Sequence, residues 1–344
     1  MVSPKRSRIA VVGTDSFRGK EIKNTLEKGR LAAVDVDFFD VDVDEEFSKL
    51  TQFCGEARAI QRLTPESLGE EDLVFLAADK DTNIAFGNQA KEKKYLAIDL
   101  NESFNQIKDI PLVVAGVNAD LIHRTKSAII ANPHPVSIIL SHIIRSLDRR
   151  FGLKRIVSSV LQPASAMEES GIQELANQSA SLLSSSPLSK KVFKAQAAFN
   201  LLSQIESLNE DGFSPQEKQV ISEIKRIFKN EDLPLSLSFI QTPVFHTYSI
   251  MSFFELKAKA TLKNIKDLFN ENSYFKFLSP SKSCPVSSIS VAGKDEIFIG
   301  QVKKDRSFPN SFWVWAVADN LTRGSALNAY AIAKEALTKH PDKK

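Results

Sequence analysis

The sequence predicts an α/β protein with two domains, the first built on a doubly wound parallel sheet and the second on a mixed sheet. Three observations support this fold class. The chain has 344 residues, which is long for a single hydrophobic core. Its first 134 residues alternate short apolar, β-branched runs with segments that suit helices, as parallel βαβ units do. From residue 135 onwards the pattern changes, beginning with a long amphipathic helix, as expected for a second domain.

The first domain opens with a buried strand at 8–12, which closes on Gly13 and leads through a turn to a helix that includes Lys20. This order is the start of a βαβ unit. Parallel strands that are covered on both faces are almost continuously apolar, so each later run of that kind predicts a further strand. These runs are 34–39, 72–77, 95–98, 112–114 and 128–130.

The second domain begins with the helix predicted at 136–150 and a strand at 155–161 that is apolar on both faces. A serine-rich tract at 179–189 favours a surface loop or helix end over a recognition segment. The remaining pattern indicates an α+β domain with one large mixed sheet, and the chain ends in an alanine-rich helix at 321–337. The strands are expected at 235–240, 249–259, 286–290 and 297–302, and the helices at 215–229 and 265–272.

The composition is that of a globular protein, with 42% hydrophobic and 25% charged residues and a net charge of +3. Lysines and arginines are dispersed, so no nucleic acid partner is expected. No run approaches about 18 apolar residues and the first residues lead into a strand, so we expect no membrane segment and a cytoplasmic location. Cys54, Cys284 and five scattered histidines match no metal motif, and the cysteines are interpreted as a buried small residue and a loop thiol.

Residues 13–19, Gly-Thr-Asp-Ser-Phe-Arg-Gly, lie between the first strand and the first helix, where a Rossmann dinucleotide loop would lie. Gly13 suits the tight turn and Gly19 suits close packing of the helix. Ser16 stands where a middle glycine lets a pyrophosphate approach the backbone, so it is expected to crowd a cofactor, although Arg18 could pair with a phosphate. The candidate cofactor contacts in the turn are Gly13, Asp15, Ser16 and Gly19, and the alternative is a turn that only connects two elements.

Asp40 closes the second strand, where an acid accepts the ribose 2′-hydroxyl of NAD and repels the 2′-phosphate of NADP. The alternative is that it belongs to a solvated acidic face within 35–46. Together the turn and Asp40 predict either no cofactor or weak NAD(P) binding, with any preference for NAD.

Several separated segments resemble the aspartate-β-semialdehyde dehydrogenase family, in the family's order. Residues 97–104 are similar to its Asp-Leu-Ser-Ser-Ala-Phe-Arg segment and 111–118 to its Pro-Leu-Val-Val-Pro-Glu-Val-Asn. Residues 157–174 resemble the strand and loop that carry Tyr-Gln-Ala-Val-Ser-Gly, and 198–200 its Ala-Phe-Asn. Residues 319–328 match its terminal Asp-Asn-Leu-Arg-Lys-Gly-Ala-Ala-Leu-Asn almost completely.

The resemblance implies a Rossmann-like dinucleotide-binding domain at 1–134 and a homodimer. It implies a dimerisation domain at 135–318 of the semialdehyde dehydrogenase and glyceraldehyde-3-phosphate dehydrogenase C-terminal type. It also implies that 319–344 forms a C-terminal helix packed back on the first domain, with Asn320 as a cofactor contact.

Residues 129–138 resemble the family's active-site turn, but Pro135 stands in place of the nucleophilic cysteine. Proline has no nucleophilic atom, although it suits the first turn of a helix. By the same resemblance the acid-base histidine falls on Tyr248 and the carboxylate-binding arginine on Gln241. Only Gln162 matches the family, at the glutamine that orients the thioester. No complete catalytic set remains.

Further charged positions of the family are also neutral here. By the same resemblance the phosphate-binding arginine falls on Asn105, and the outer acid and base of the Glu-Glu-x-Lys helix motif fall on Gln216 and Gln219. Ser137 lies two residues beyond Pro135, but without a matched histidine it is a poor nucleophile. No catalytic metal is expected.

These changes favour a catalytically inactive homologue that keeps a dimeric binding or scaffolding role, with a small molecule or nucleotide as its ligand. The alternative is an active NAD(P)-dependent oxidoreductase of amino-acid biosynthesis that acts on a changed substrate. Kinship with acylglutamyl-phosphate reductases is a third hypothesis, which the ending at 319–328 disfavours.

Overall fold

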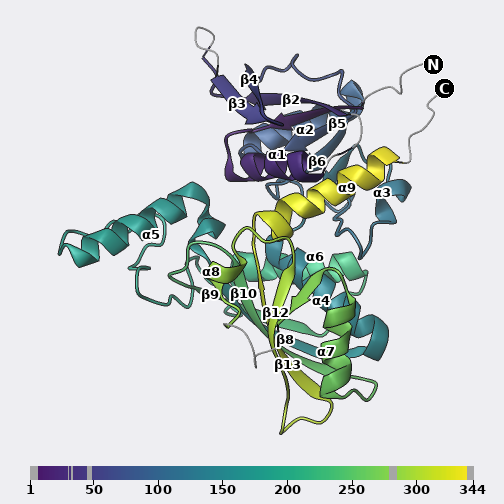
Figure 1. Cartoon of the computed structure of the whole chain (residues 1–344), viewed down its shortest axis with the longest axis vertical. Helices are drawn as coiled ribbons and strands as arrows, with labels where there is room; N and C mark the ends of the chain where they lie inside the picture. Colours follow the sequence, from purple (N-terminus) through teal and green to yellow (C-terminus); the bar gives the residue numbers. More distant parts are fainter. Residues whose placement is uncertain (1–6, 30, 32–33, 45–48, 279–284, 339–344) are drawn as a thin grey trace. The chain divides into compact units, whose positions relative to one another are not determined.

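The computed structural model describes residues 7–29, 31, 34–44, 49–278 and 285–338, so Cys284 lies outside the described residues. The chain divides into two compact units (Figure 1). The first unit comprises residues 1–134 and 325–344, and the second comprises residues 135–324. The predicted combination of a parallel-sheet domain with an α+β domain is confirmed.

The sheet of the first unit has seven strands in the order β3-β4-β2-β1-β5-β6-β7. Every neighbouring pair is parallel except β3 with β4, which form an antiparallel hairpin at one edge. The carboxyl ends of the parallel strands therefore meet at one edge of the sheet, where ligands bind in such folds. The strands are β1 (Ser7–Val12), β2 (Val34–Asp40), β3 (Lys49–Phe53), β4 (Glu56–Arg62), β5 (Leu73–Leu76), β6 (Leu96–Asp99) and β7 (Ile129–Ala131).

Helices cover both faces of this sheet, as a doubly wound fold requires. Buried residues of α1, α3 and α9 share one apolar cluster with β1, β2 and β5. α2 packs on the opposite face, because a Cβ on its Gly87 would lie 3.4 Å from Leu76. The helices are α1 (Phe17–Gly29), α2 (Lys80–Lys93), α3 (Leu121–Arg124) and α9 (Leu327–Thr338).

Three details of the first unit differ from the sequence prediction. The strand expected at 112–114 is reduced to an isolated bridge between Leu112 and Ala131. The β3–β4 hairpin was not predicted, because its residues are mostly exposed and polar and give no buried run. Cys54 lies in the hairpin turn with φ of 51° and is exposed, so its interpretation as a buried residue is wrong.

The second unit contains a six-stranded mixed sheet in the order β11-β12-β13-β10-β8-β9. Its two outer pairs are parallel and its three inner pairs are antiparallel. The strands are β8 (Leu153–Gln162), β9 (Leu235–Gln241), β10 (Tyr248–Leu256), β11 (Phe275–Phe277), β12 (Ile297–Lys304) and β13 (Ser311–Ala318).

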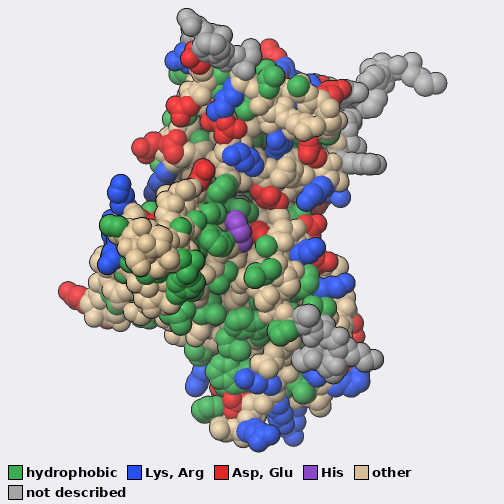
Figure 2. Space-filling model, turned by 60° about the vertical axis from the view of Figure 1, so that its left-hand side comes forward, with side chains coloured by type: hydrophobic (Ala, Val, Ile, Leu, Met, Phe, Trp, Pro, Cys, Tyr) green, Lys and Arg blue, Asp and Glu red, His purple; other side chains and the backbone are tan. Residues whose placement is uncertain are grey.

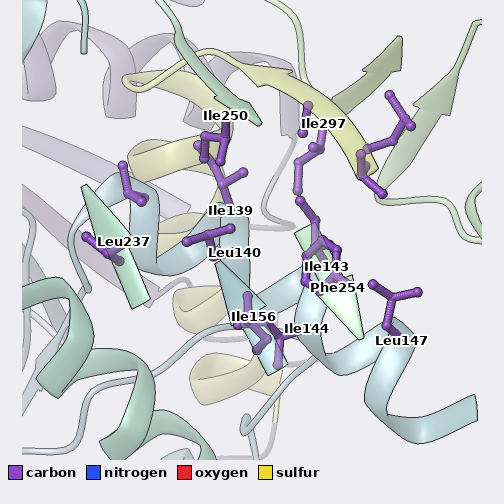
Figure 3. Close-up of a cluster of buried hydrophobic side chains, with 14 of the residues drawn as sticks. Ile139, Leu140, Ile143, Ile144, Leu147, Ile156, Leu237, Ile250, Phe254 and Ile297 are labelled. Carbon is purple, nitrogen blue, oxygen red and sulfur yellow. The ribbon is translucent and has the colours of Figure 1, made fainter. Parts of the chain in front are cut away.

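One face of the mixed sheet is covered by α4, α6 and α7, whose apolar residues form a single core with it. Residues of α4 spaced three and four apart turn toward the sheet, as expected for an amphipathic helix. Each fully buried leucine or isoleucine contributes roughly 1.5–3 kcal/mol. The covering helices are α4 (Pro135–Phe151), α6 (Pro215–Phe228) and α7 (Leu262–Glu271). Figure 3 labels Ile139, Leu140, Ile143, Ile144 and Leu147 of α4 beside Ile156, Leu237, Ile250, Phe254 and Ile297 of the strands.

The remaining elements of the second unit lie outside this core. α5 (Glu168–Leu183) projects away from the sheet (Figure 1). Because it ends at Leu183, the beginning of the serine-rich tract is helical. The Glu174 carboxylate of α5 accepts hydrogen bonds from the backbone N–H groups of Lys191, Val192 and Phe193. The strand expected at 286–290 is wrong, since the serines there cap the short helix α8 (Ser288–Val291). Two short turns remain. η1 (Ala164–Met167) lies in the second unit, and the π-helical η2 (Thr322–Ala326) spans the chain boundary at residue 324.

The second unit extends to residue 324, beyond the domain end at 318 that the resemblance implies. Residues 319–324 belong to the second unit, because the Asp319 carboxylate accepts the N–H groups of Gly293, Leu321 and Thr322 within that unit. α9 belongs to the first unit, where the Asn328 side chain joins it to the carboxyl edge of the sheet. Asn328 Oδ1 accepts from Ala115 N–H at 2.8 Å, and its Nδ2 donates to Val113 O and Asn132 Oδ1, both at 2.8 Å.

Replacing this side chain should destabilise the first unit. We expect Asn328→Leu to lower its free energy of unfolding by about 3 kcal/mol, since three buried polar groups lose their partner. Thermal unfolding followed by circular dichroism measures the loss. Asn88→Leu, the same change at an exposed position of α2, is the control and should have little effect. Equal stability of the two variants would contradict the anchoring role of Asn328.

Candidate active site

The first turn of α4 places Pro135 at the start of a helix whose first four residues are all buried. Proline fits here because the first helical N–H groups have no intrahelical acceptor, and its ring fixes φ near the helical value. The η2 turn lies against it, since a Cβ added to Gly324 would be 2.8 Å from Pro135 Cβ. Two residues further on, the Ser137 hydroxyl is buried and has no hydrogen-bond partner among the described residues.

Three strand ends bring Gln162, Gln241 and Tyr248 together. Gln162 ends β8, Gln241 ends β9, and the parallel register of these strands pairs the two residues directly. Tyr248 begins β10, which runs antiparallel to β8. The three side chains are 2%, 2% and 1% exposed. The structure therefore gathers three of the positions that the sequence analysis singled out.

These three side chains form one chain of hydrogen bonds. The Tyr248 hydroxyl donates to Gln162 Oε1 at 3.4 Å, and Gln162 Nε2 donates to Gln241 Oε1 at 3.2 Å. Gln241 Nε2 in turn donates to the carbonyl of Thr242 at 3.0 Å. Its members are two neutral amides and a phenol that donates its hydroxyl hydrogen. The arrangement can orient or exchange hydrogen bonds, but it provides no cation to hold a carboxylate.

Asn320 supports the bend that precedes Tyr248. Its Oδ1 accepts from Thr247 N–H at 3.2 Å and from Ser165 Oγ at 3.1 Å. Thr247 has φ of 74°, an unusual value for a β-branched residue, and its hydroxyl is buried without a partner among the described residues. Asn320 was named from the resemblance as a cofactor contact, but its acceptor serves this bend within the second unit.

The α6 residues Gln216 and Gln219 are half-buried, and the buried one of the two charged residues between them is structural. Glu217 forms a capping box with Ser214 at the start of α6 and accepts from Phe239 N–H at 2.9 Å. Gln219 donates to Glu223 at 2.9 Å. In the first unit, Asn105 is buried. It is the position that the resemblance gives to the phosphate-binding arginine.

The turn between β1 and α1 in the first unit has the geometry that its glycines require. Gly13 has φ of 81°, and a Cβ there would lie 2.4 Å from the backbone nitrogen of Ala78. A Cβ on Gly19 would lie 2.0 Å from Gly13 O, so the turn and the helix touch. Ser16 precedes α1, and its hydroxyl accepts from Gly19 N–H at 2.8 Å as a helix N-cap. Asp15 forms an ion pair with Lys49.

A buried aromatic stack in the second unit was not found by the sequence analysis. The His142 ring on α4 lies 4.0 Å from the Tyr274 ring at an angle of 28°, and the Arg323 guanidinium lies 5.5 Å from that Tyr274 ring. Burial, and to a lesser extent Arg323, lowers the pKa of His142 to about 3. His142 is therefore neutral in the folded protein at neutral pH. These three residues are far apart in the sequence and share no motif.

Metal and membrane sites are not indicated by the part of the chain that the structure describes. No group of three or more histidine, cysteine, aspartate or glutamate side chains there could hold a metal ion. Among the same residues, no helix combines the length and apolar character needed to cross a bilayer.

The chain combines a doubly wound parallel sheet with a mixed-sheet domain, and a helix begins where the chain enters the second domain. This combination is typical of two-domain α/β proteins of the dehydrogenase type. Family models match both parts of the chain. Residues 8–125 match "Semialdehyde dehydrogenase, NAD binding domain", and residues 145–323 match "Semialdehyde dehydrogenase, dimerisation domain". The chain belongs to the semialdehyde dehydrogenase family, which confirms the resemblance seen in its sequence.

Individual relatives agree with this classification over almost the whole chain. An aspartate-semialdehyde dehydrogenase of Rickettsia bellii is 28% identical over 333 residues, covering 96% of this chain and 98% of that protein. That of Bacillus subtilis is 27% identical over 335 residues, covering 95% and 96%. The structure of aspartate semialdehyde dehydrogenase II from Vibrio cholerae, complexed with ASA, is similar with a TM-score of 0.90 at 25% identity, covering 98% of this chain and 99% of that one.

The buried histidine should make the second unit sensitive to acid. The pKa of His142 is about 3 when folded and about 6.5 when unfolded, so below pH 6.5 the unfolded chain binds a proton that the folded chain does not. The contribution of neutral His142 to the free energy of unfolding is complete above pH 6.5 and is lost as the pH falls toward 3. We expect this residue to remove about 2 kcal/mol of stability between pH 7 and pH 5.

His142→Phe keeps a ring against Tyr274 and cannot bind the proton, so its urea midpoint should fall less between pH 7 and pH 5. Tryptophan fluorescence follows the second unit, because Trp313 and Trp315 both lie there. Burial also lowers the pKa of His134 in the first unit. If the two units unfold together, His134 should therefore leave some pH dependence in the urea midpoint of the His142→Phe variant. Identical pH dependence in the variant and the original chain would refute the role of His142.

Proposed function

We propose that this chain is a homologue of aspartate-semialdehyde dehydrogenase that does not perform the family's covalent chemistry and acts as a dimeric binding or scaffolding protein in amino-acid metabolism. One observation carries the proposal. The chain has proline at the position that the resemblance gives to the nucleophile, and the buried side chains of Gln162, Gln241 and Tyr248 form an uncharged hydrogen-bonded chain.

The covalent step requires a nucleophile that this helix start does not offer. Covalent catalysis needs a thiolate, hydroxyl, amine or carboxylate that an adjacent base or a positive environment activates. Pro135 has none of these groups. The Ser137 hydroxyl is the nearest one along α4, but it has no hydrogen-bond partner among the described residues, and therefore no base.

Proton transfer and substrate binding are also affected. A phenol at Tyr248 is a much weaker base at neutral pH than the imidazole of the family, and general acid–base catalysis contributes about 10²–10⁴-fold to a rate. Gln241 offers a neutral amide in place of a guanidinium, and charge-assisted hydrogen bonds are roughly twice as strong as neutral ones. These losses are separate, so restoring one group leaves the others missing.

A dimer is supported by the face of the mixed sheet opposite α4, α6 and α7, which these helices leave uncovered. Val157, Phe253 and Trp313 are cross-strand neighbours and therefore share that face, as Met251 and Trp315 do in the next row. Val157 is 41% exposed. Figure 2 shows hydrophobic side chains gathered on the visible surface. A contiguous apolar surface of this kind marks an interface, and the family model over this unit is described as a dimerisation domain.

The enzymatic test uses aspartate semialdehyde, inorganic phosphate and either NAD or NADP between about pH 6 and 9, a range that spans the titration of thiol and imidazole groups. We expect no reduced nicotinamide above a protein-free blank, while the Vibrio cholerae enzyme serves as the positive control. Pro135→Cys should remain inactive, and so should its control Ser137→Cys. Turnover by the unaltered chain, or a robust rate from Pro135→Cys alone, would contradict the proposal and favour an active oxidoreductase.

The oligomeric state can be tested independently. Light scattering at micromolar concentration should give twice the chain mass of 38.2 kDa. Val157→Glu places a carboxylate on the uncovered sheet face and should shift the mass toward that of a monomer. Leu50→Glu introduces the same charge on β3 of the first unit and should leave the dimer intact. A monomeric unaltered chain would refute the dimer.

A further inference from the structure

The backbone N–H groups of Gly13, Asp15 and Gly19 in the β1–α1 turn are directed to acceptors within the first unit. In a dinucleotide-binding turn such groups hold the pyrophosphate at the helix N-terminus. Here Asp15 N–H donates to Asp40 Oδ2 at 3.1 Å, and Gly13 N–H donates to Phe39 O at 3.0 Å. Gly19 N–H donates to the Ser16 hydroxyl at 2.8 Å. A phosphate that took the Asp15 N–H would have to displace the Asp40 carboxylate.

The guanidinium of the turn is paired in the same way. Arg18 lies in the first turn of α1, where it could meet a phosphate, and its side chain is only 14% exposed. It donates to Asn101 Oδ1 and lies 3.6 Å from the Glu102 carboxylate. Glu102 has φ of 60°, a left-handed conformation that is unfavourable for glutamate. The backbone therefore adopts an uncommon geometry at the residue that neutralises Arg18.

The outer side of the turn is acidic. Lys49 forms an ion pair with Asp15, and Asp40 and Asp42 lie close enough to act on the same ammonium group. The hydrogen bond that Lys49 donates to Asp15, with the charges of the other two acids, raises the pKa of Lys49. Three carboxylates thus surround one lysine, and this local excess of negative charge opposes a pyrophosphate or a 2′-phosphate.

Ser16, which the sequence analysis expects to crowd a cofactor, directs its hydroxyl to partners within the first unit. Its hydroxyl donates to Ala77 O at 2.8 Å and accepts from Gly19 N–H at 2.8 Å, so both roles are satisfied inside the unit. Removing it would remove the N-cap of α1, which is worth roughly 1 kcal/mol. It would leave the pairing of Asp15 with Asp40 and of Arg18 with Glu102 unchanged.

We propose that Asp40 and Glu102 hold the dinucleotide turn in a self-paired state, in which two carboxylates of the chain take the donors that phosphate groups would use. These two residues, rather than Ser16, determine selectivity against anionic nucleotides. The residues present therefore do not fit a tightly bound dinucleotide phosphate cofactor. The proposal concerns the first unit and is independent of the chemistry lost in the second.

The test is calorimetric titration of the full chain with NAD, NADP and inorganic pyrophosphate. The unaltered protein should bind each only weakly, with a Kd above about 1 mM. The double variant Asp40→Asn/Glu102→Gln keeps the side-chain shapes and removes both charges, and should bind pyrophosphate and NADP at least about 10-fold more tightly. The gain should be larger for NADP than for NAD, because Asp40 opposes the 2′-phosphate. It should shrink as salt is raised.

Two control variants separate the local effect from alternatives. Asp109→Asn/Glu92→Gln removes the same two charges from exposed positions of the first unit and should give no gain. Ser16→Gly should give no gain and should lower the melting temperature. The proposal is overturned by micromolar binding of NADP to the unaltered protein, by a gain in Ser16→Gly that equals the double variant, or by a folded double variant that binds no better than the original chain.

Discussion

The free energy lost when a buried polar group has no partner, about 1–3 kcal/mol, is the constraint on which both units of this protein depend. In the second unit it joins Gln162, Gln241 and Tyr248 into one chain of hydrogen bonds. In the first unit it fixes α9 through Asn328 and the β1–α1 turn through Asp40. In each case the partner is a side chain or backbone group of the chain itself.

The start of α4 illustrates how an uncharged site is compatible with a buried helix terminus. A helix N-terminus carries partial positive charge and several unsatisfied N–H groups, which an anion or a thiolate can stabilise. Pro135 removes one such donor outright, and two arginines in the last turn complement the opposite end. The helix is anchored by its apolar contacts with the mixed sheet. It therefore needs no anion at its N-terminus to remain in place.

The sequence identifies elements whose signals are local. The periodicity of α4 and the glycines of the β1–α1 turn predict what the structure contains, since each reflects a short-range steric or apolar pattern. The β3–β4 hairpin, the helix at α8 and the exposed Cys54 escaped prediction, because their polar residues carry no periodic signal. The stack of His142 on Tyr274 joins residues more than one hundred positions apart, and the pairing of Asp40 with Asp15 depends on a side-chain direction, which no spacing specifies.

Pro135 also has an evolutionary consequence if the function we propose is correct. A proline whose native φ suits a helix start stabilises a protein by roughly 0.4–1 kcal/mol, because it restricts the unfolded chain. Enzymes commonly sacrifice stability for reactive residues, so a lineage that no longer needs its nucleophile is free to recover that stability. Reversion to cysteine would then forfeit this gain before any activity returned, because Gln241 and Tyr248 would have to change as well. On the proposed function, the proline in the first turn of α4 therefore opposes a return to the family's covalent chemistry.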